Sequence, residues 1–181
     1  MSPDSISPHL FSSCTPILLL MSVCIVYHSE TGNTKRVAEA VAKATGAVLV
    51  PVRDTAGYSR ITMYLIGAPR ARKGETAVIE PPQIDVSGYD LIVVGSPVWA
   101  WRPTPGANAA IAALTGCAGK RGMVFATSGG QPGETLRILK DALSGRGLKV
   151  EGSFHFSRRE LGDARKLGGF IDAVKKASGK A

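Results

Sequence analysis

The segment from Val23 to Ala42 changes its hydrophobic pattern once, and that change limits the folds open to this chain. Residues 23–27 form a continuous apolar run, VCIVY, which is typical of a strand buried on both faces of a parallel sheet. From residue 37 onward the apolar residues recur at helical spacing instead: Val37, Ala38, Val41 and Ala42. Six small or polar residues, SETGNT at 29–34, separate the two patterns. The pattern predicts a strand, a tight loop and a helix.

The same alternation continues along the chain. Further strands are expected at 47–52, 91–96, 123–128 and 148–156, and further helices at 108–114, 134–143 and 167–177. Strands separated by helices imply right-handed crossovers and a parallel sheet covered on both faces. We therefore expect one α/β domain over residues 21–181.

The connection between the second and third strands, residues 53–90, is too long for a plain helical crossover. Ser59 is a candidate cap for a short helix, with Gly67 and Pro69 as its stop. The basic residues that follow, within 70–74, are expected in an exposed loop.

Residues 1–20 differ in composition from the rest, because they contain no Lys or Arg. A secretory signal would need a positively charged start, and the apolar stretch from Ile17 is short for a membrane span. We interpret 1–20 as a disordered extension, with Met21 as a possible true start and a membrane anchor as the alternative. No membrane span is predicted.

Charge and cysteine content narrow the function classes. Lys and Arg outnumber Asp and Glu by 22 to 14, a formal charge of +8, which favours an acidic partner. Cys14, Cys24 and Cys117 are too few and scattered for a disulfide framework, so a reduced, cytoplasmic chain is expected, with Cys24 as a small core residue. Outside residues 98–102 no basic and aromatic residues interleave as in nucleic-acid binding, so no nucleic-acid partner is expected.

The SETGNT loop has the chemistry of a phosphate site. It presents backbone N–H groups at a helix start, hydroxyls from Ser29, Thr31 and Thr34, and a glycine that leaves room for a ligand. Neither G-x-x-x-x-G-K-[ST] nor G-x-G-x-x-G follows a predicted strand, so a monophosphate held by neutral donors without a metal is the natural ligand. The alternative is an ordinary helix start capped by Ser29 or Thr31.

Three motifs in order resemble the flavodoxin family. SETGNT matches that family's phosphate-loop pattern [ST]-x-T-G-N-T, YDLIVVGSPVWAWRP at 89–103 is similar to its third strand and first flavin loop, and VFATSGG at 124–130 to its fourth strand and second flavin loop. The resemblance covers 23–177 and implies a flavodoxin-like three-layer α/β fold, with a five-stranded parallel sheet of order 2-1-3-4-5. The fifth strand is uninterrupted, as in the short form of the family.

The resemblance also implies non-covalent FMN as cofactor, no catalytic side chain and no metal. Its cofactor-binding residues would be Ser29, Glu30, Thr31, Gly32, Asn33 and Thr34 around the phosphate, Pro97, Val98, Trp99, Ala100 and Trp101 in the first flavin loop, and Thr127, Ser128, Gly129 and Gly130 in the second. The two tryptophans stand in a loop bracketed by prolines, where burial is difficult, so they are expected to contact the flavin ring. His28 is interpreted as a spectator at the strand end.

Two flavin-dependent functions remain open, and a flavin-free signalling or scaffold function on the same architecture is disfavoured. The first is an electron-transfer protein that shuttles one or two electrons between redox partner proteins; the alternative is an NAD(P)H-dependent reductase of a quinone, a flavin or another small acceptor. In the alternative, the basic 70–74 segment would attract the nucleotide phosphates. A flavin-free signalling receiver would need an acidic pair where Tyr27 and His28 stand. Electron-carrying relatives are acidic, and Arg102 beside the flavin loop predicts a less reducing flavin than theirs.

Overall fold

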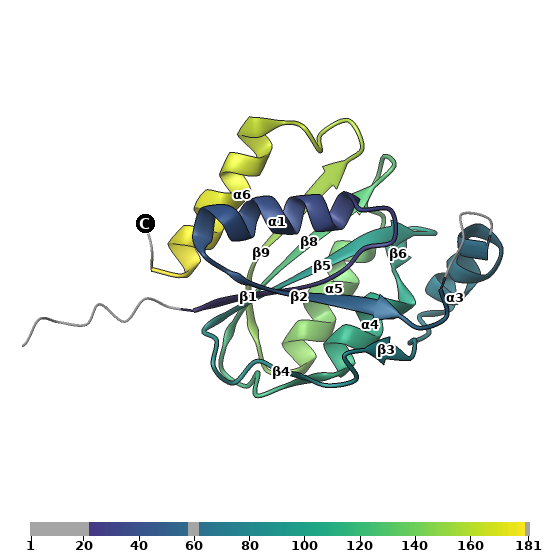
Figure 1. The fold of residues 1–181 in the computed structure, drawn as a ribbon, viewed down its shortest axis with the longest axis horizontal. Helices are drawn as coiled ribbons and strands as arrows, with labels where there is room; N and C mark the ends of the chain where they lie inside the picture. The colour runs from purple at the N-terminus through teal and green to yellow at the C-terminus, as the bar shows by residue number, and fades with distance from the viewer. Residues whose placement is uncertain (1–21, 58–61, 180–181) are drawn as a thin grey trace, which may run out of the picture.

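The computed structural model describes residues 22–57 and 62–179 and contains one central, mainly parallel sheet (Figure 1). Its long strands are β1 (Val23–His28), β2 (Val48–Asp54), β5 (Leu91–Trp99), β8 (Arg121–Ser128) and β9 (Lys149–Ser157). They pair in parallel in the spatial order β2-β1-β5-β8-β9. In chain order these strands read 2-1-3-4-5, so the predicted flavodoxin-like fold is confirmed.

Four two-residue strands add to the predicted five. β3 (Ile79–Glu80) pairs antiparallel with β2 at the sheet edge, and β6 (Arg102–Pro103) pairs antiparallel with the end of β5. A separate small sheet joins β4 (Ile84–Asp85) to β7 (Leu114–Thr115). These strands are too short for an apolar period to reveal, because two residues contain no repeat.

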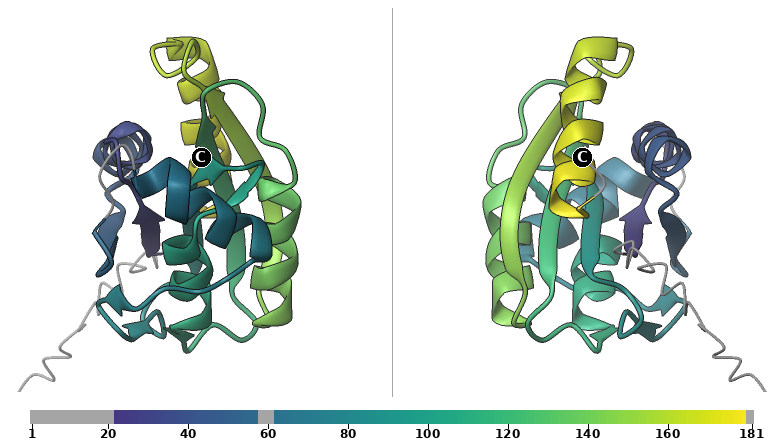
Figure 2. Two further views of the ribbon diagram at one scale, coloured as in Figure 1. Left: turned by 90° about the vertical axis from the view of Figure 1, so that its right-hand side faces the viewer. Right: turned by 90° about the vertical axis from the view of Figure 1, so that its left-hand side faces the viewer.

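Helices cover both faces of the sheet. On one face α1 (Asn33–Thr45) and α6 (Ala164–Ala177) pack over a core that includes Phe125, Phe156 and Phe170. On the other face α4 (Pro105–Ala112) and α5 (Thr135–Gly145) pack over a core that includes Ile92 and Leu139. In Figure 2, α5 and α6 lie on opposite sides of β9. The two cores share no residue, because alternate residues of each strand face opposite sides.

Capping residues explain why two helices begin earlier than expected. The Thr104 hydroxyl accepts from the Ala107 N–H at 3.2 Å and starts α4 three residues before Asn108. Asp163 accepts from the N–H groups of Arg165 and Lys166 and starts α6 at Ala164. Apolar spacing alone, used in the prediction, does not register such caps.

The expectation for the segment after β2 was wrong in one respect. Gly67 and Pro69 do not stop a helix: a π-helix, η1 (Met63–Gly67), runs directly into α3 (Ala68–Lys73). Pro69 is the second residue of α3, which continues from η1 without a break. The basic residues predicted in a loop therefore lie on α3, which ends at Gly74 with φ 71°. The proposed cap, Ser59, is outside the described residues.

Residues 1–20 and Met21 are also outside the described part of the chain, so the interpretation of the N-terminal extension stays a prediction. Within residues 22–57 and 62–179, no helix is long and apolar enough to cross a membrane. Cys24 is buried in the sheet core, as expected, and this burial raises the pKa of its thiol to about 12.

Candidate functional site

The carboxyl ends of β1, β5 and β8 meet at one edge of the sheet, and the loops that follow them surround a cavity of about 730 Å³. This volume lies within the range of small-molecule sites. The cavity wall combines side chains from the three loops with one residue of α3 and one after β9. Its lining residues are Thr31, Asn33, Ala68, Pro97, Val98, Trp99, Ala100, Trp101, Thr127, Ser128, Gly129 and Arg158.

The first loop joins β1 to α1 and leaves several backbone donors free. Gly32 stands at the start of α1 with φ 85°, a left-handed conformation that glycine adopts without strain. The first backbone hydrogen bond of the helix runs from Arg36 N–H to the Gly32 carbonyl at 2.9 Å. Among the described residues, the N–H groups of Thr31, Gly32, Asn33 and Thr34 donate to no protein atom. Four unpaired donors at a helix start suit an anion.

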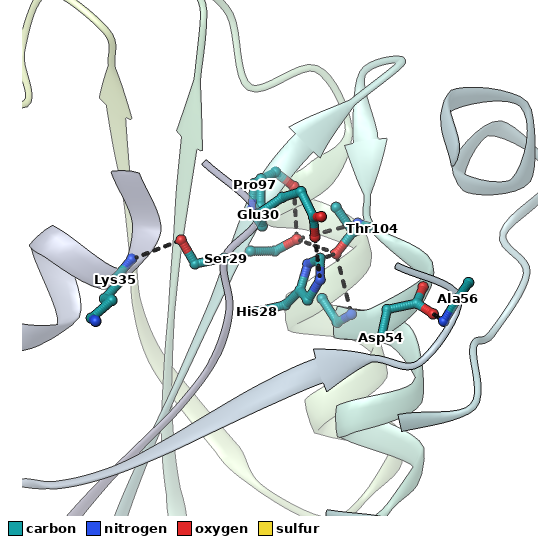
Figure 3. A network of polar contacts seen from close by, with 10 residues as sticks. His28, Ser29, Glu30, Lys35, Asp54, Ala56, Pro97 and Thr104 are labelled. Atoms are coloured by element: carbon teal, nitrogen blue, oxygen red, sulfur yellow. Dashed lines mark hydrogen bonds and ion pairs between the residues drawn. The ribbon is translucent and has the colours of Figure 1, made fainter. Parts of the chain in front are cut away.

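Side chains of this loop fix its shape. The Ser29 hydroxyl accepts from the Lys35 N–H at 3.1 Å (Figure 3), so Ser29 does cap one N–H of α1, as the alternative interpretation held. The N–H groups of residues 31–34 nevertheless remain without a protein acceptor among the described residues. Thr34 is buried, and its hydroxyl shares a 2.8 Å hydrogen bond with that of Thr127. This bond joins the first loop to the third across β5.

The second loop is a tight hairpin between β5 and β6. Val98 faces Pro103 and Trp99 faces Arg102, which leaves Ala100 and Trp101 as the two turn residues. Both have positive φ, 48° and 65°, as a two-residue turn of type I′ requires. Neither is glycine or asparagine, so each left-handed residue carries a strain of roughly 1–2 kcal/mol.

Contacts with residues 133–134 hold this hairpin in place. The Trp101 carbonyl accepts from the Glu134 N–H at 2.9 Å, and Gly133 lies so close that a Cβ there would stand 2.4 Å from the Trp101 Cβ. The Arg102 guanidinium forms an ion pair with the Glu134 carboxylate at 3.2 Å. Arg102 is therefore not an isolated positive charge, which reduces the effect on flavin potential that the sequence suggested.

The two tryptophans have different environments, contrary to the expectation that neither would be buried. Trp99 is only 7% exposed, because the backbone of Gly67 covers its ring. A Cβ at Gly67 would stand 2.6 Å from the Trp99 Cζ3 atom. Trp101 is 68% exposed at the mouth of the cavity. Trp101 is thus the tryptophan with a free face for a planar ligand.

A buried hydrogen-bond network lies below the hairpin (Figure 3). His28 is 1% exposed, and its Nδ1 atom lies 2.9 Å from the Thr104 hydroxyl. Thr104 in turn donates its N–H to the Ser96 hydroxyl at 3.2 Å. The Glu30 carboxylate lies 3.6 Å from His28 Nε2. His28 does not line the cavity; it connects the first loop to the base of the hairpin.

The third loop follows β8. The Ser128 hydroxyl lies 2.7 Å from His155 Nε2 and accepts from the Gly130 N–H at 3.1 Å. Burial lowers the pKa of His155, and the positive charge of Lys166 lowers it further. A neutral imidazole therefore positions the Ser128 side chain at the cavity wall at neutral pH.

Ten of the fifteen predicted site residues line the cavity. The five that do not are Ser29, Glu30, Gly32, Thr34 and Gly130. Two lining residues, Ala68 and Arg158, were missed. No local motif marks either one, because Ala68 reaches the cavity through the packing of α3 and Arg158 through the position of β9 beside β8.

The basic residues of α3 are partly engaged within the segment itself. Arg70 forms an ion pair with Glu75 at 3.0 Å and also donates to the Thr76 carbonyl, and Lys73 lies 4.0 Å from the same Glu75. Arg72 is exposed. Within the described ranges, no three His, Cys, Asp or Glu side chains converge into a metal site.

Solved structures with the same architecture include flavodoxins and flavoproteins. A candidate flavoprotein from Bacteroides eggerthii has a TM-score of 0.69 and 22% identity, covering 85% of this chain and 98% of the other. A flavoprotein from Lactobacillus acidophilus in complex with FMN has a TM-score of 0.61 and 24% identity, covering 82% and 99%. Oxidised flavodoxin 2 from Bacillus cereus has a TM-score of 0.56 and 21% identity, covering 86% and 98%. At these identities the likeness shows a shared fold.

Sequence comparison adds the family. No curated protein sequence matches this chain. The sequence model of the family described as Flavodoxin matches residues 22–150, which include all three loops of the cavity. With this match over most of its length and the 2-1-3-4-5 sheet, the chain belongs to the flavodoxin family.

Proposed function

We propose that this protein binds FMN non-covalently in the 730 Å³ cavity and transfers one or two electrons between redox partners. The observation that carries the proposal is the composition of the cavity lining: unpaired backbone donors in the first loop, an exposed tryptophan in the second and, among the described lining residues, no Asp, Glu, His, Cys or Lys. Such a wall can bind and orient a ligand but offers no acid or base for catalysis. The electron chemistry would come from the flavin.

Each end of the cavity fits one part of FMN. The free N–H groups of Thr31, Gly32 and Asn33 would hold the phosphate, together with the Thr31 hydroxyl. Trp101 would stack on the flavin ring, with the backbone of Ser128 and Gly129 at the ring's polar edge. Stacking of this kind contributes about 0.5–1.5 kcal/mol beyond the area it buries.

The surface near the cavity favours a protein partner of acidic character. Leu65 is 71% exposed and Ile66 52% exposed, in the helical segment that supplies Ala68 to the cavity wall. The chain as a whole has a formal charge of +8. Exposed apolar groups on a basic molecule suit brief contact with an acidic redox protein, since opposite charge speeds the encounter.

The reductase alternative has less support. It relied on the basic 70–74 segment as a site for the phosphates of NAD(P)H, but Glu75 already pairs with Arg70 and lies within reach of Lys73. Arg72 and Lys73 are both exposed, but Lys73 lies near the Glu75 carboxylate, which partly offsets its charge.

The visible spectrum of the purified protein with FMN tests the proposal. We expect FMN to bind, its fluorescence to be quenched, and the bound flavin to stay oxidised when NADPH or NADH is added without oxygen. Rapid bleaching by either nucleotide would establish the reductase instead. Absence of FMN binding would refute both functions.

A further inference from the structure

Among the residues that the structure describes, Arg158 is the only charged one that lines the cavity, and no part of the proposed function uses it. It is the first residue after β9, whose last residue, Ser157, lies beside Ser128 at the end of β8. Arg158 therefore stands next to the third loop, although its own sequence surroundings contain no motif.

The lining of the cavity brings Arg158 together with residues of the first loop. Phe154 and Phe156 pack against Phe170 of α6, with ring centroids 4.5 and 5.9 Å apart. Arg158 comes two residues after Phe156, in the turn that follows β9, and lines the cavity from there. The first loop is joined to the end of β8 by the hydrogen bond between the Thr34 and Thr127 hydroxyls. Arg158 thus shares the cavity with Thr31 and with Asn33, the first residue of α1.

The charge of Arg158 is not neutralised within the described structure. Its nearest acidic neighbour in sequence, Glu160, is held elsewhere: it accepts from Lys166 Nζ at 2.7 Å and from the Ser157 N–H at 2.9 Å. No carboxylate of the described residues lies within 4.0 Å of Arg158. Arg102 differs in this respect, because Glu134 pairs with it.

We propose that Arg158 binds the phosphate of the cavity's ligand, as a cation added to the neutral donors of residues 31–34. This inference rests on the proposed binding of FMN. A guanidinium can donate two parallel hydrogen bonds to a phosphate, and the paired charges strengthen both. The proposal departs from the prediction that neutral donors alone hold the phosphate.

Comparison of FMN with riboflavin, which has the same ring and no phosphate, tests the assignment. The dissociation constants of both flavins are measured by fluorescence quenching for the wild type, Arg158→Gln, Arg158→Lys and the matched control Arg159→Gln. Arg159 is also exposed but does not line the cavity. We expect Arg158→Gln to weaken FMN binding by about tenfold and riboflavin binding by less than about twofold. Arg158→Lys should lose less, and Arg159→Gln less than about twofold for either flavin.

Each other outcome has a distinct meaning. Equal weakening of both flavins by Arg158→Gln would overturn the inference, because the arginine would then act on the ring or on the fold. Unchanged FMN affinity would overturn it as well, while leaving the proposed function intact. Failure of the wild type to bind FMN would refute the proposed function and this inference with it. As a second readout, added salt should weaken FMN binding more in the wild type than in Arg158→Gln.

Discussion

The first and second loops of the cavity reach their shapes by different means. In the first loop, residues 29–34, the one left-handed position is occupied by Gly32, and the next residues begin a helix. In the hairpin, two left-handed positions are occupied by Ala100 and Trp101, which resist that conformation. The first loop adopts backbone conformations that its residues favour, whereas the second adopts conformations that its residues disfavour.

The hairpin keeps its shape because other parts of the chain enforce it. Glu134 binds the Trp101 carbonyl, Gly133 lies against the Trp101 backbone, and Gly67 covers Trp99. Strained backbone of this kind persists only where surrounding contacts determine it, and it is frequent at ligand sites. The contrast predicts that the conformation of the hairpin depends on glycines elsewhere in the chain, whereas the conformation of the first loop depends on the glycine within it.

The largest effect is expected at Gly133, which supports the hairpin. A Cβ there would stand 2.5 Å from the Trp101 carbonyl oxygen, and Gly133 itself has φ 54°. Gly133→Ala should lower the free energy of unfolding by about 3 kcal/mol, since backbone cannot yield as a side chain can. Urea unfolding without added flavin measures this. Gly129→Ala is the control, because a Cβ at Gly129 meets nothing within 4 Å. Similar losses of stability in Gly133→Ala and Gly129→Ala would contradict the prediction that the hairpin depends on Gly133.

In the first loop, Gly32→Ala should lower the free energy of unfolding by about 1 kcal/mol through backbone strain alone. No atom lies within 4 Å of a Cβ at this position, so no collision adds to the loss. Gly46→Ala, at the other end of α1 with φ 71°, offers the same strain away from the cavity. We expect equal losses of stability in urea unfolding, but weaker FMN binding in Gly32→Ala only. Equal FMN affinities in Gly32→Ala and Gly46→Ala would show that the first loop is not part of the FMN site.

Relief of strain in the hairpin should have a smaller effect of opposite sign. Ala100→Gly removes a left-handed strain of roughly 1–2 kcal/mol and loses roughly 0.4–1 kcal/mol to the greater freedom of the unfolded chain. The net result is a change in the free energy of unfolding of roughly 0 to +1.6 kcal/mol, with a rise of about 0.8 kcal/mol at the midpoints of the two ranges. A variant less stable than the wild type in urea would show that Ala100 is not strained.

The smallest effect concerns the third loop, which depends on a titratable group. Burial lowers the pKa of His155 in the folded protein, so below about pH 6.5 the unfolded chain takes up a proton that the folded chain refuses. This contribution to stability is therefore complete above that pH and is lost as the pH falls toward the lower folded-state pKa. His155→Gln should flatten the decline in stability on acidification. If the stabilities of the wild type and His155→Gln fell in parallel as the pH was lowered, His155 would not be the source of the decline.

The sequence predicted the parts of this molecule that local patterns encode. The positions of the long strands and the faces of the helices followed from apolar spacing, and the strand order followed from the resemblance of three motifs to the flavodoxin family. The burial of Trp99 could not be predicted, because it depends on Gly67, which lies 32 positions earlier in a segment taken to end a helix. Arg158 was missed for the same physical reason: its role comes from strand pairing, and single exposed arginines are common.

The helical segment 62–73 gives the cavity an outer wall that does not belong to the sheet. It is inserted between β2 and β3, it covers Trp99 through Gly67, and it reaches the cavity through Ala68. The donors of residues 31–34 are on a different part of the chain. The segment that borders the cavity on the outside and the residues that would bind the ligand's phosphate are consequently different parts of the chain. Substitutions along 62–73 can change which molecules reach the cavity while the sheet and the first loop remain as they are.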